Sequence, residues 1–308
     1  MKVAVIDLGT NTCNLLVAEI AGKEYKILHQ SKQLIRLGDG QIRNHKISEE
    51  ALERTIKVLK EQRKITESYG VEIIKVLATS GVRMAKNKDY FLKKTSETAG
   101  CPVEVISGEL EAELIFKGVL LALENLYDVS LIMDIGGGSN ELILAHQKEI
   151  LWKESQPTGM ARIINQFILS DPIKPSEVQI LQNFFEARHQ DAVHQCRERV
   201  ANTLIGCSGT FDTIADIIDQ VEPGEKQRQF QLIELKDFYR VYDQLLLSTR
   251  QQRLDLKGMD SVRVDLIVPA IIFVEHMINK AGISKIIQTD YALREGAIWE
   301  LLEKKEAT

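Results

Sequence analysis

The chain has 308 residues, which is enough for two domains of ordinary size that each bury a core of their own. Its composition, 44% apolar and 27% charged, is that of a soluble globular protein, and no window approaches the roughly 20 apolar residues of a membrane span. A net charge of −5 argues against general nucleic-acid binding, which needs a basic face, but a polyanion could still bind in a locally basic cleft.

The opening residues, MKVAVID, are typical of a strand and lack the basic and apolar regions of a secretory signal. We therefore expect a cytoplasmic protein with no membrane and no nucleic-acid partner. Residues 1–125 are predicted to form a first β-β-β-α-β-α-β-α domain, in which Ser48 caps the first helix and Gly70 ends it. Its strands are expected at 3–7, 13–20, 25–36, 71–79 and 101–106, and its helices within 46–70, 87–100 and 108–125.

Residues 129–156 repeat the opening pattern of strand, tight turn, strand, turn and strand. We therefore expect a second domain at 126–308, with the last helix a candidate to pack back on the first domain. Its helices are expected at about 159–168, 176–200, from Phe211, 235–248, 262–280 and from Leu293, with strands at 202–208 and 285–290. The polar stretch 219–231 is the best candidate for a mobile loop.

Two stretches of similar build, DLGTNTCNLLV from Asp7 and DIGGGSNELIL from Asp134, place an acidic residue before a tight turn and a returning strand. Backbone N–H groups that such turns leave unpaired bind anions. The residues that add neutral donors, or that permit close approach, are Thr10, Asn11, Thr12, Gly136, Gly137, Gly138, Ser139 and Asn140. Either turn alone could be an ordinary glycine hairpin, but two of them, one in each domain, favour a pair of facing phosphate sites.

The acidic residues at the two turns indicate a metal. Asp7 and Asp134 would repel phosphate unless a divalent cation lay between them, so the pattern predicts Mg²⁺. The four cysteines and six histidines have no spacing typical of a zinc or redox site, and we expect the thiols to be reduced and structural.

Glu111 lies one turn into the helix that connects the two predicted domains, with Glu109 and Glu113 nearby. At least two of these glutamates are expected only to stabilise the helix N-terminus. One of the three could instead face the cleft and accept a proton from an attacking water, although the spacing does not say which one.

Six segments in order resemble the exopolyphosphatase/guanosine pentaphosphate phosphohydrolase (Ppx/GppA) family over essentially the whole chain. They are DLGTNT, VLATSGVRMA, VISGELEAELIF, DIGGGSNEL, GCSGTFDTIAD and YALREGAIWE. The resemblance implies a two-domain α/β fold of the actin-like, acetate-kinase (ribonuclease H-like) type with a central cleft. It also implies Mg²⁺-dependent release of terminal phosphate from polyphosphate or pppGpp, and a homodimer.

The resemblance also assigns roles to particular residues. It places the catalytic base at Glu111, and it implies that Asp134 and Glu141 position metal and water, with Asp7 as a further metal ligand. Arg83 matches an arginine that reaches phosphate in relatives. The loop Ser208, Gly209 and Thr210 matches one that faces the polyanion.

The sequence departs from the family pattern at several positions. Leu110 stands where a glutamate is usual, Asn140 replaces a threonine, and Thr10 and Thr12 replace serines, while the base and the donors survive. Many relatives carry a basic residue where this chain has Asn14, and no helical region of the HD type follows residue 308. We therefore expect a short-form member that prefers short polyphosphate chains or pppGpp-like ends.

Two other functions fit the same superfold. A kinase or ATPase would need ATP and an acceptor or a nucleotide-driven closure, and a (p)ppGpp sensor would bind without releasing phosphate. Cys207 and Ser208 are rival covalent nucleophiles, but no adjacent base is evident in the sequence.

Overall fold

Two sheets organise the chain in the computed structural model, which describes residues 1–308 except 23, 39–43 and 307–308. The first sheet has the order β3-β2-β1-β4-β5 and the second the order β10-β11-β9-β6-β7-β8. The first comprises β1 (Lys2–Leu8), β2 (Thr12–Ala21), β3 (Glu24–Leu34), β4 (Ile73–Ala78) and β5 (Val103–Val105). The second comprises β6 (Leu126–Ile135), β7 (Asn140–Gln147), β8 (Glu149–Gln156), β9 (Thr203–Cys207), β10 (Gln231–Ile233) and β11 (Lys285–Thr289).

The two sheets share one connectivity. In the first, β1, β2 and β3 form an antiparallel meander and β4 runs parallel beside β1. In the second, β6, β7 and β8 form the meander and β9 runs parallel beside β6. The predicted repetition of the opening pattern is confirmed. The division of the chain into domains at residue 125 stays a prediction.

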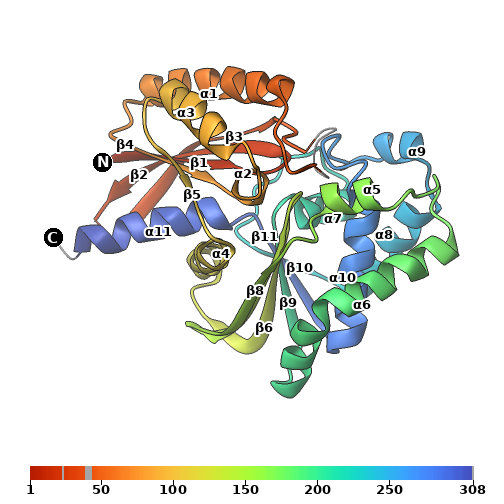
Figure 1. The fold of residues 1–308 in the computed structure, drawn as a ribbon. Helices are drawn as coiled ribbons and strands as arrows, with labels where there is room; N and C mark the ends of the chain where they lie inside the picture. Colours follow the sequence, from red (N-terminus) through yellow and green to blue (C-terminus); the bar gives the residue numbers. More distant parts are fainter. Residues whose placement is uncertain (23, 39–43, 307–308) are drawn as a thin grey trace.

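Helices cover the outer faces of both sheets and fill the space between them (Figure 1). Helices α1 (Glu49–Tyr69) and α3 (Lys88–Ala99) lie over the first sheet, and α4 (Gly108–Leu123) and α11 (Leu293–Glu306) lie between the sheets. The second sheet is covered by α5 (Met160–Gln166), α6 (Pro175–Glu198), α7 (Gly209–Asp219), α8 (Leu235–Leu247) and α10 (Ile267–Ala281). Two short helices, α2 (Ser80–Arg83) and α9 (Arg250–Leu254), were not expected. None of the described helices is long and apolar enough to cross a membrane.

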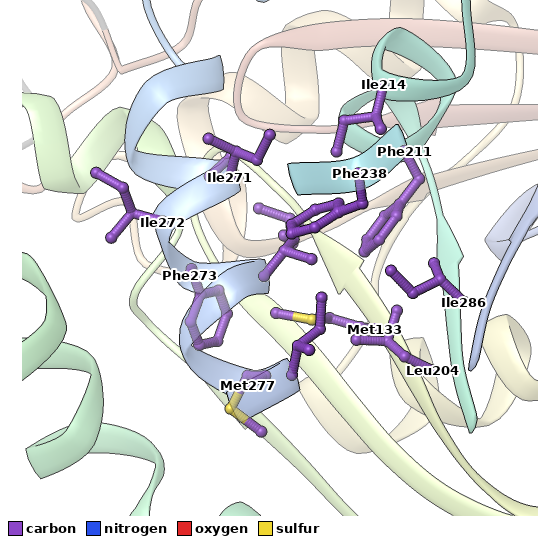
Figure 2. Packing of buried hydrophobic residues seen from close by; sticks show 14 of the residues in the cluster. Met133, Leu204, Phe211, Ile214, Phe238, Ile271, Ile272, Phe273, Met277 and Ile286 are labelled. Atoms are coloured by element: carbon purple, nitrogen blue, oxygen red, sulfur yellow. The ribbon is translucent and has the colours of Figure 1, made fainter. Parts of the chain in front are cut away.

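The outer cores use alternate residues of the strands. Ala4 and Ile6 of β1 pack with residues of α1 and α3. In the second sheet, Met133 of β6 packs against the aromatic cluster of Phe211, Phe238 and the α10 residues that Figure 2 shows. The central strands β1 and β9 are buried on both faces, so they are nearly continuous apolar runs.

The inner core joins both sheets through α4 and α11. Val3 and Val5 of β1 and Ile132 of β6 belong to this one cluster. Because strand side chains alternate with period two, Asp7 continues the row of Val5, and Asp134 continues the row of Ile132. The two acidic residues therefore end their strands on the sheet faces that look toward each other.

Local capping fixes the helix starts. Ser48 accepts a hydrogen bond from the Ala51 N–H at 3.2 Å, and Gly70 ends α1 at a φ of +65°, as the sequence predicts. Ser107 caps α4 by accepting from the Leu110 N–H at 3.1 Å. This cap places Glu111 in the first turn of α4.

The polar stretch 219–231 is anchored, contrary to our expectation of a mobile loop. Arg228 is only 4% exposed and lies 2.7 Å from Asp216 and 2.8 Å from Asp219. The polar composition correctly predicts an irregular segment. It cannot predict that Arg228 forms buried ion pairs with two residues of α7, which hold the segment in place. The stretch then ends in β10, which is too short for a period-two pattern to be recognised.

Candidate active site

The two turns contact each other. A Cβ built on Gly137 would lie 3.4 Å from the Cβ atoms of Thr10 and Asn11, and one built on Gly138 would lie 2.2 Å from Thr10 Oγ1. The contact at Gly137 would be an ordinary one, but at Gly138 the second turn could not approach the first this closely if the residue carried a side chain. The juxtaposition that the sequence predicts is confirmed.

Backbone bonds hold the first turn in place. The Gly9 N–H donates to the Thr12 carbonyl at 2.9 Å, and the Leu37 N–H donates to the Thr10 carbonyl at 2.8 Å. The carbonyl of Asn11 accepts from residues 35 and 36. The Thr10 hydroxyl is buried and has no partner among the described residues. A buried hydroxyl without a partner is costly unless a ligand completes it, so Thr10 is a candidate donor to an anion.

The second turn is clamped by the segment that follows β8. The Met160 and Ala161 N–H groups donate to the carbonyls of Gly136 and Gly137, each at 2.9 Å. The Arg162 Nε–H donates to the Gly138 carbonyl at 2.8 Å. The carbonyl oxygens of the glycines, which would repel an anion, are thus engaged by residues 160–162.

Four carboxyl groups lie near the turns, and burial shifts their pKa values. Burial raises the pKa of Asp7 above its ordinary value, that of Asp134 to about 6 and that of Glu141 to about 7. Burial and the nearby Glu141 raise the pKa of Glu111 well above its ordinary value, against the opposing effect of Arg83. Such a cluster of buried acids carries its full negative charge only beside a compensating cation.

Each of these carboxyl groups has a hydrogen-bond partner from another element. Asn14 donates to Asp7 at 3.0 Å, Ser155 donates to Glu141 at 2.7 Å, and Ser208 donates to Asp134 at 2.6 Å. Ser208 adopts a φ of +70°, a left-handed conformation that side chains other than glycine rarely take. The strained Ser208 and the adjoining start of α7, with Gly209 and Thr210, lie beside Asp134.

Glu111, which is buried, and Arg83, which is partly buried, form an ion pair. The Arg83 Nη1 donates to Glu111 Oε2 at 2.9 Å and to the Ile106 carbonyl at 2.8 Å. A Cβ on Gly108, at the start of α4, would lie 3.6 Å from Arg83 Nη2 and 2.4 Å from Ser155. The pair therefore lies against the second sheet as well as the first, beside the Ser155 that holds Glu141.

Asn140 differs from its expected role as a side-chain donor to phosphate. It is fully buried, and its Nδ2 donates to the carbonyl and the hydroxyl of Thr158 at 2.8 and 3.1 Å. The side chain thus supports the turn from behind instead of reaching an anion. The sequence pattern did not reveal this, because Thr158 lies 18 residues away.

The expected metal ligands Asp7, Asp134 and Glu141 do not form a ready-made set. In the described part of the chain no three His, Cys, Asp or Glu residues are placed so that they could hold a metal ion together. Mg²⁺ is usually bound by one or two carboxylates, with waters and substrate phosphates as the other ligands. The arrangement therefore agrees with a metal that is completed by substrate, and not with an all-protein metal cage.

Arg263 is a site residue that sequence reasoning missed. It is 8% exposed, its Nε has no partner among the described residues, and a Cβ on Gly209 would lie 2.6 Å from that atom. The charge of Arg263 also opposes the rise in the pKa of Asp134. The sequence did contain one indication of this role. Arg263 lies shortly before the N-terminus of the apolar helix α10, where a positive charge is unfavourable unless it binds an anionic group.

A small cavity lies beside the first turn. It is lined by Thr10, Gly81 and Arg162 among others, and its volume of about 20 Å³ is room for about one water molecule. This cavity is too small for a phosphate group as it stands.

Cys207 is unsuited to covalent catalysis. Its thiol is fully buried, and burial raises its pKa well above the ordinary value. A thiol in this environment is not a thiolate, which is the nucleophilic form.

The chain matches known proteins over nearly its whole length. The exopolyphosphatase 2 of Mycobacterium tuberculosis is 28% identical over 309 residues, which cover 96% of this chain and 97% of that protein. The bifunctional 3-dehydroquinate synthase/phosphatase of Fusobacterium nucleatum is 31% identical over 322 residues, which cover 98% of this chain but 47% of that protein. The chain thus spans about half the length of the second relative.

A solved structure confirms the fold class expected from the sequence, a two-domain α/β fold of the actin-like type. The crystal structure of an exopolyphosphatase from Cytophaga hutchinsonii has a TM-score of 0.94 and 36% sequence identity, covering 99% of this chain and 98% of that one. The family model of the Ppx/GppA phosphatase family matches residues 16–305. The chain therefore belongs to the Ppx/GppA phosphatase family, as its motifs indicate.

Proposed function

We propose that the protein is a Mg²⁺-dependent exopolyphosphatase that hydrolyses the terminal phosphate of short inorganic polyphosphate chains. One observation carries the proposal. Two turns from different sheets, each with the pattern expected of an anion-binding turn, contact each other, and the Glu111–Arg83 pair lies close to them. The expected homodimer and cytoplasmic location stay predictions.

The donors at the junction fit a divalent cation. Asp7, Asp134 and Glu141 offer hard carboxylate oxygens, and burial raises the pKa of each of them, which a bound cation would reverse. We propose that Asp134 and Glu141 hold the ion, with Asp7 close by. When bound, Mg²⁺ would neutralise charge on the phosphate oxygens.

The residues of the chain divide the remaining work. The backbone of the glycine turn, Thr10 and Arg263 bind the oxygens of the terminal phosphate, and Arg83 neutralises charge that develops in the transition state. Glu111 accepts the proton of a water whose oxygen attacks the terminal phosphorus. The bond to the bridging oxygen breaks, so the products are orthophosphate and a chain shorter by one phosphate. Phosphoryl transfer demands mainly such positioning and charge stabilisation.

The raised pKa of Glu111 supports its role as the base. A general base works best when its pKa is near the working pH, and burial with Glu141 nearby moves Glu111 in that direction. Arg83 keeps the carboxylate oriented at 2.9 Å. In this mechanism water attacks directly, so no covalent enzyme intermediate forms.

A parallel assay tests the proposal against its alternatives. The intact protein is incubated with polyphosphates of graded length, pppGpp, and ATP with sugar or acyl acceptors, each with and without Mg²⁺, and the products are identified. Release of orthophosphate from short polyphosphates, only with Mg²⁺, is the expected result. Release from pppGpp alone would make the protein a pppGpp phosphohydrolase, and transfer to an acceptor would make it a kinase. Binding of ppGpp without release of phosphate from any substrate would make it a sensor.

A further inference from the structure

A chain of polar side chains, three of them buried and the last partly exposed, runs from the second turn into the outer layer of the second sheet. Its members are Asn140, Thr158, His189 and Glu154. Asn140 Nδ2 lies 3.1 Å from Thr158 Oγ1, which lies 3.0 Å from His189 Nε2. His189 Nδ1 then lies 2.9 Å from Glu154 Oε1. None of these contacts belongs to the chemistry proposed above.

His189 is held where its helix is irregular. It is fully buried on α6 and has φ −120° and ψ 20°, which is not helical. Its ring packs on Phe273 of α10 with a centroid distance of 4.6 Å. Both ring nitrogens of His189 have partners, and its backbone departs from helical geometry. We therefore infer that these contacts, and not helix formation, determine its position.

The partners fix the direction of the hydrogen bonds. The Glu154 carboxylate can only accept, so His189 Nδ1 carries a proton and donates it to Glu154. In the neutral ring Nε2 is then unprotonated and accepts from the Thr158 hydroxyl, whose oxygen accepts in turn from Asn140 Nδ2. The chain of contacts therefore selects one neutral tautomer of His189, as carboxylate partners of histidine commonly do.

Thr158 begins the segment that clamps the glycine turn. A Cβ on the next residue, Gly159, would lie 2.5 Å from backbone atoms of Gly137 and Gly138. Residues 160–162 then take up the glycine carbonyls. Rotation of Thr158 would consequently move the clamp, and the clamp determines where the turn presents its N–H groups.

We propose that His189, held by Glu154, is a positioning residue that orients the phosphate turn through Thr158 and Asn140. The inference rests on the proposed function for its kinetic consequence. It touches neither substrate nor metal, and it acts on the preorganisation of the turn. Preorganised donors contribute most in the transition state, so loss of the contacts should lower kcat more than it raises KM.

The test compares matched substitutions in the intact protein. Thr158→Val removes the hydroxyl and keeps the shape, whereas Thr158→Ser keeps the hydroxyl. His189→Phe removes both ring contacts, and His276→Phe alters another buried histidine with a glutamate neighbour, 3.5 Å from Glu186, on α10. We expect Thr158→Val and His189→Phe to lower kcat roughly tenfold with less than about a threefold change in KM. Thr158→Ser should restore most of the rate, and His276→Phe should leave the kinetics unchanged.

Two readouts do not depend on turnover. Nitrogen-15 NMR of the His189 ring should show the proton on Nδ1, and calorimetry with inorganic phosphate should show weaker binding to Thr158→Val than to Thr158→Ser. A proton on Nε2, or equal phosphate affinity of the two variants, would overturn the proposal. So would wild-type kcat in Thr158→Val. If the unmodified protein releases phosphate from no substrate, the proposed function fails, while the tautomer and the phosphate affinity still decide this inference.

Discussion

The two turns begin from the same pattern of acid, small polar residues and returning strand, yet their surroundings differ. The first turn has backbone support from residues 35–37 and a buried Thr10 hydroxyl without a partner among the described residues. The second turn is clamped at three carbonyls by residues 160–162 and supported from behind by Asn140. The second turn is therefore the more firmly held of the two. The first turn has a donor, the Thr10 hydroxyl, that only a bound ligand would satisfy.

The acidic residues follow the same division. Asp7 of the first turn accepts a hydrogen bond from Asn14. Asp134 of the second turn is paired with Ser208 and lies opposite Glu141 in the β6–β7 register. A divalent cation is therefore expected to be held mainly by the second turn, and the first turn closes over it.

The largest effect should come from the Glu111 carboxylate at the start of α4. Glu111→Gln keeps the size and a hydrogen bond to Arg83 but cannot accept a proton, so we expect kcat to fall by ~10²–10⁴ with folding and substrate binding kept. Steady-state phosphate release and calorimetric substrate binding measure this. Glu109→Gln, at an exposed position in the same helical turn, is the matched control and should be active. Near-normal turnover of Glu111→Gln would remove Glu111 from the mechanism.

The contact between the turns can be broken by one methyl group. A Cβ on Gly138 would lie 2.2 Å from Thr10 Oγ1 and 2.9 Å from Ser80 Oγ, so in Gly138→Ala the Thr10 hydroxyl must turn away or the two turns must move apart, and we expect the turns to move. Displacement of this order costs up to about 10²-fold in rate, and we expect a loss of about 10- to 100-fold in kcat/KM. Small-angle scattering should show a more open molecule. A fully active, equally compact Gly138→Ala protein would mean that the turns do not close during turnover.

How much of this could be predicted from the sequence depends on distance along the chain. The turns, the caps at Ser48 and Gly70, and the place of Glu111 in the first turn of α4 follow from residues a few positions apart. Period-two alternation also puts Asp7 and Asp134 on defined faces of their strands. These features were predictable because local geometry determines them.

The partners of the site residues were not predictable in this way. Ser155 on Glu141, Ser208 on Asp134 and Thr158 on Asn140 come from other strands or loops, and the short α2 that carries Arg83 has too few residues for a helical period. Their meeting depends on the packing of the second sheet. A single sequence without the family resemblance does not contain that information in any local pattern.

A pH measurement can separate the stability of the second sheet's core from chemistry at the turns. Burial lowers the pKa of His276 from 6.5 to about 4. Between these pH values the histidine is neutral in the folded protein and protonated in the unfolded chain. At this residue the unfolded state then binds more protons between these values, so the contribution of His276 to stability falls as pH drops from about 6.5 to about 4 and changes no further below that. The raised pKa values of Asp134 and Glu141 contribute with the opposite sign, so only a comparison with a His276 variant isolates the histidine. We expect the contribution of His276 to fall by an amount on the order of 1–3 kcal/mol over this window.

Denaturant unfolding at pH 7.5, 6 and 5 is compared between the unmodified protein and His276→Phe. The stability of the substituted protein should rise relative to that of the unmodified protein between pH 7.5 and 5, because the group that gains a proton on unfolding is gone. Identical pH profiles would show that His276 does not contribute, and that acid acts through other groups.

The smallest effect should come from the ion pair that joins the first turn's sheet to the second half of the chain. Lys32 of β3 lies 2.5 Å from Asp260, and its side chain is 34% exposed. Exposed pairs are worth about 0–1 kcal/mol, so Lys32→Met should shift the balance between open and closed forms by no more than about fivefold. If closure over the substrate limits the rate, kcat/KM should fall by that factor, and added salt should produce the same loss in the unmodified protein but not in Lys32→Met. A loss of activity as large as that of Gly138→Ala would show that closure depends on this pair more than on the contact between the turns.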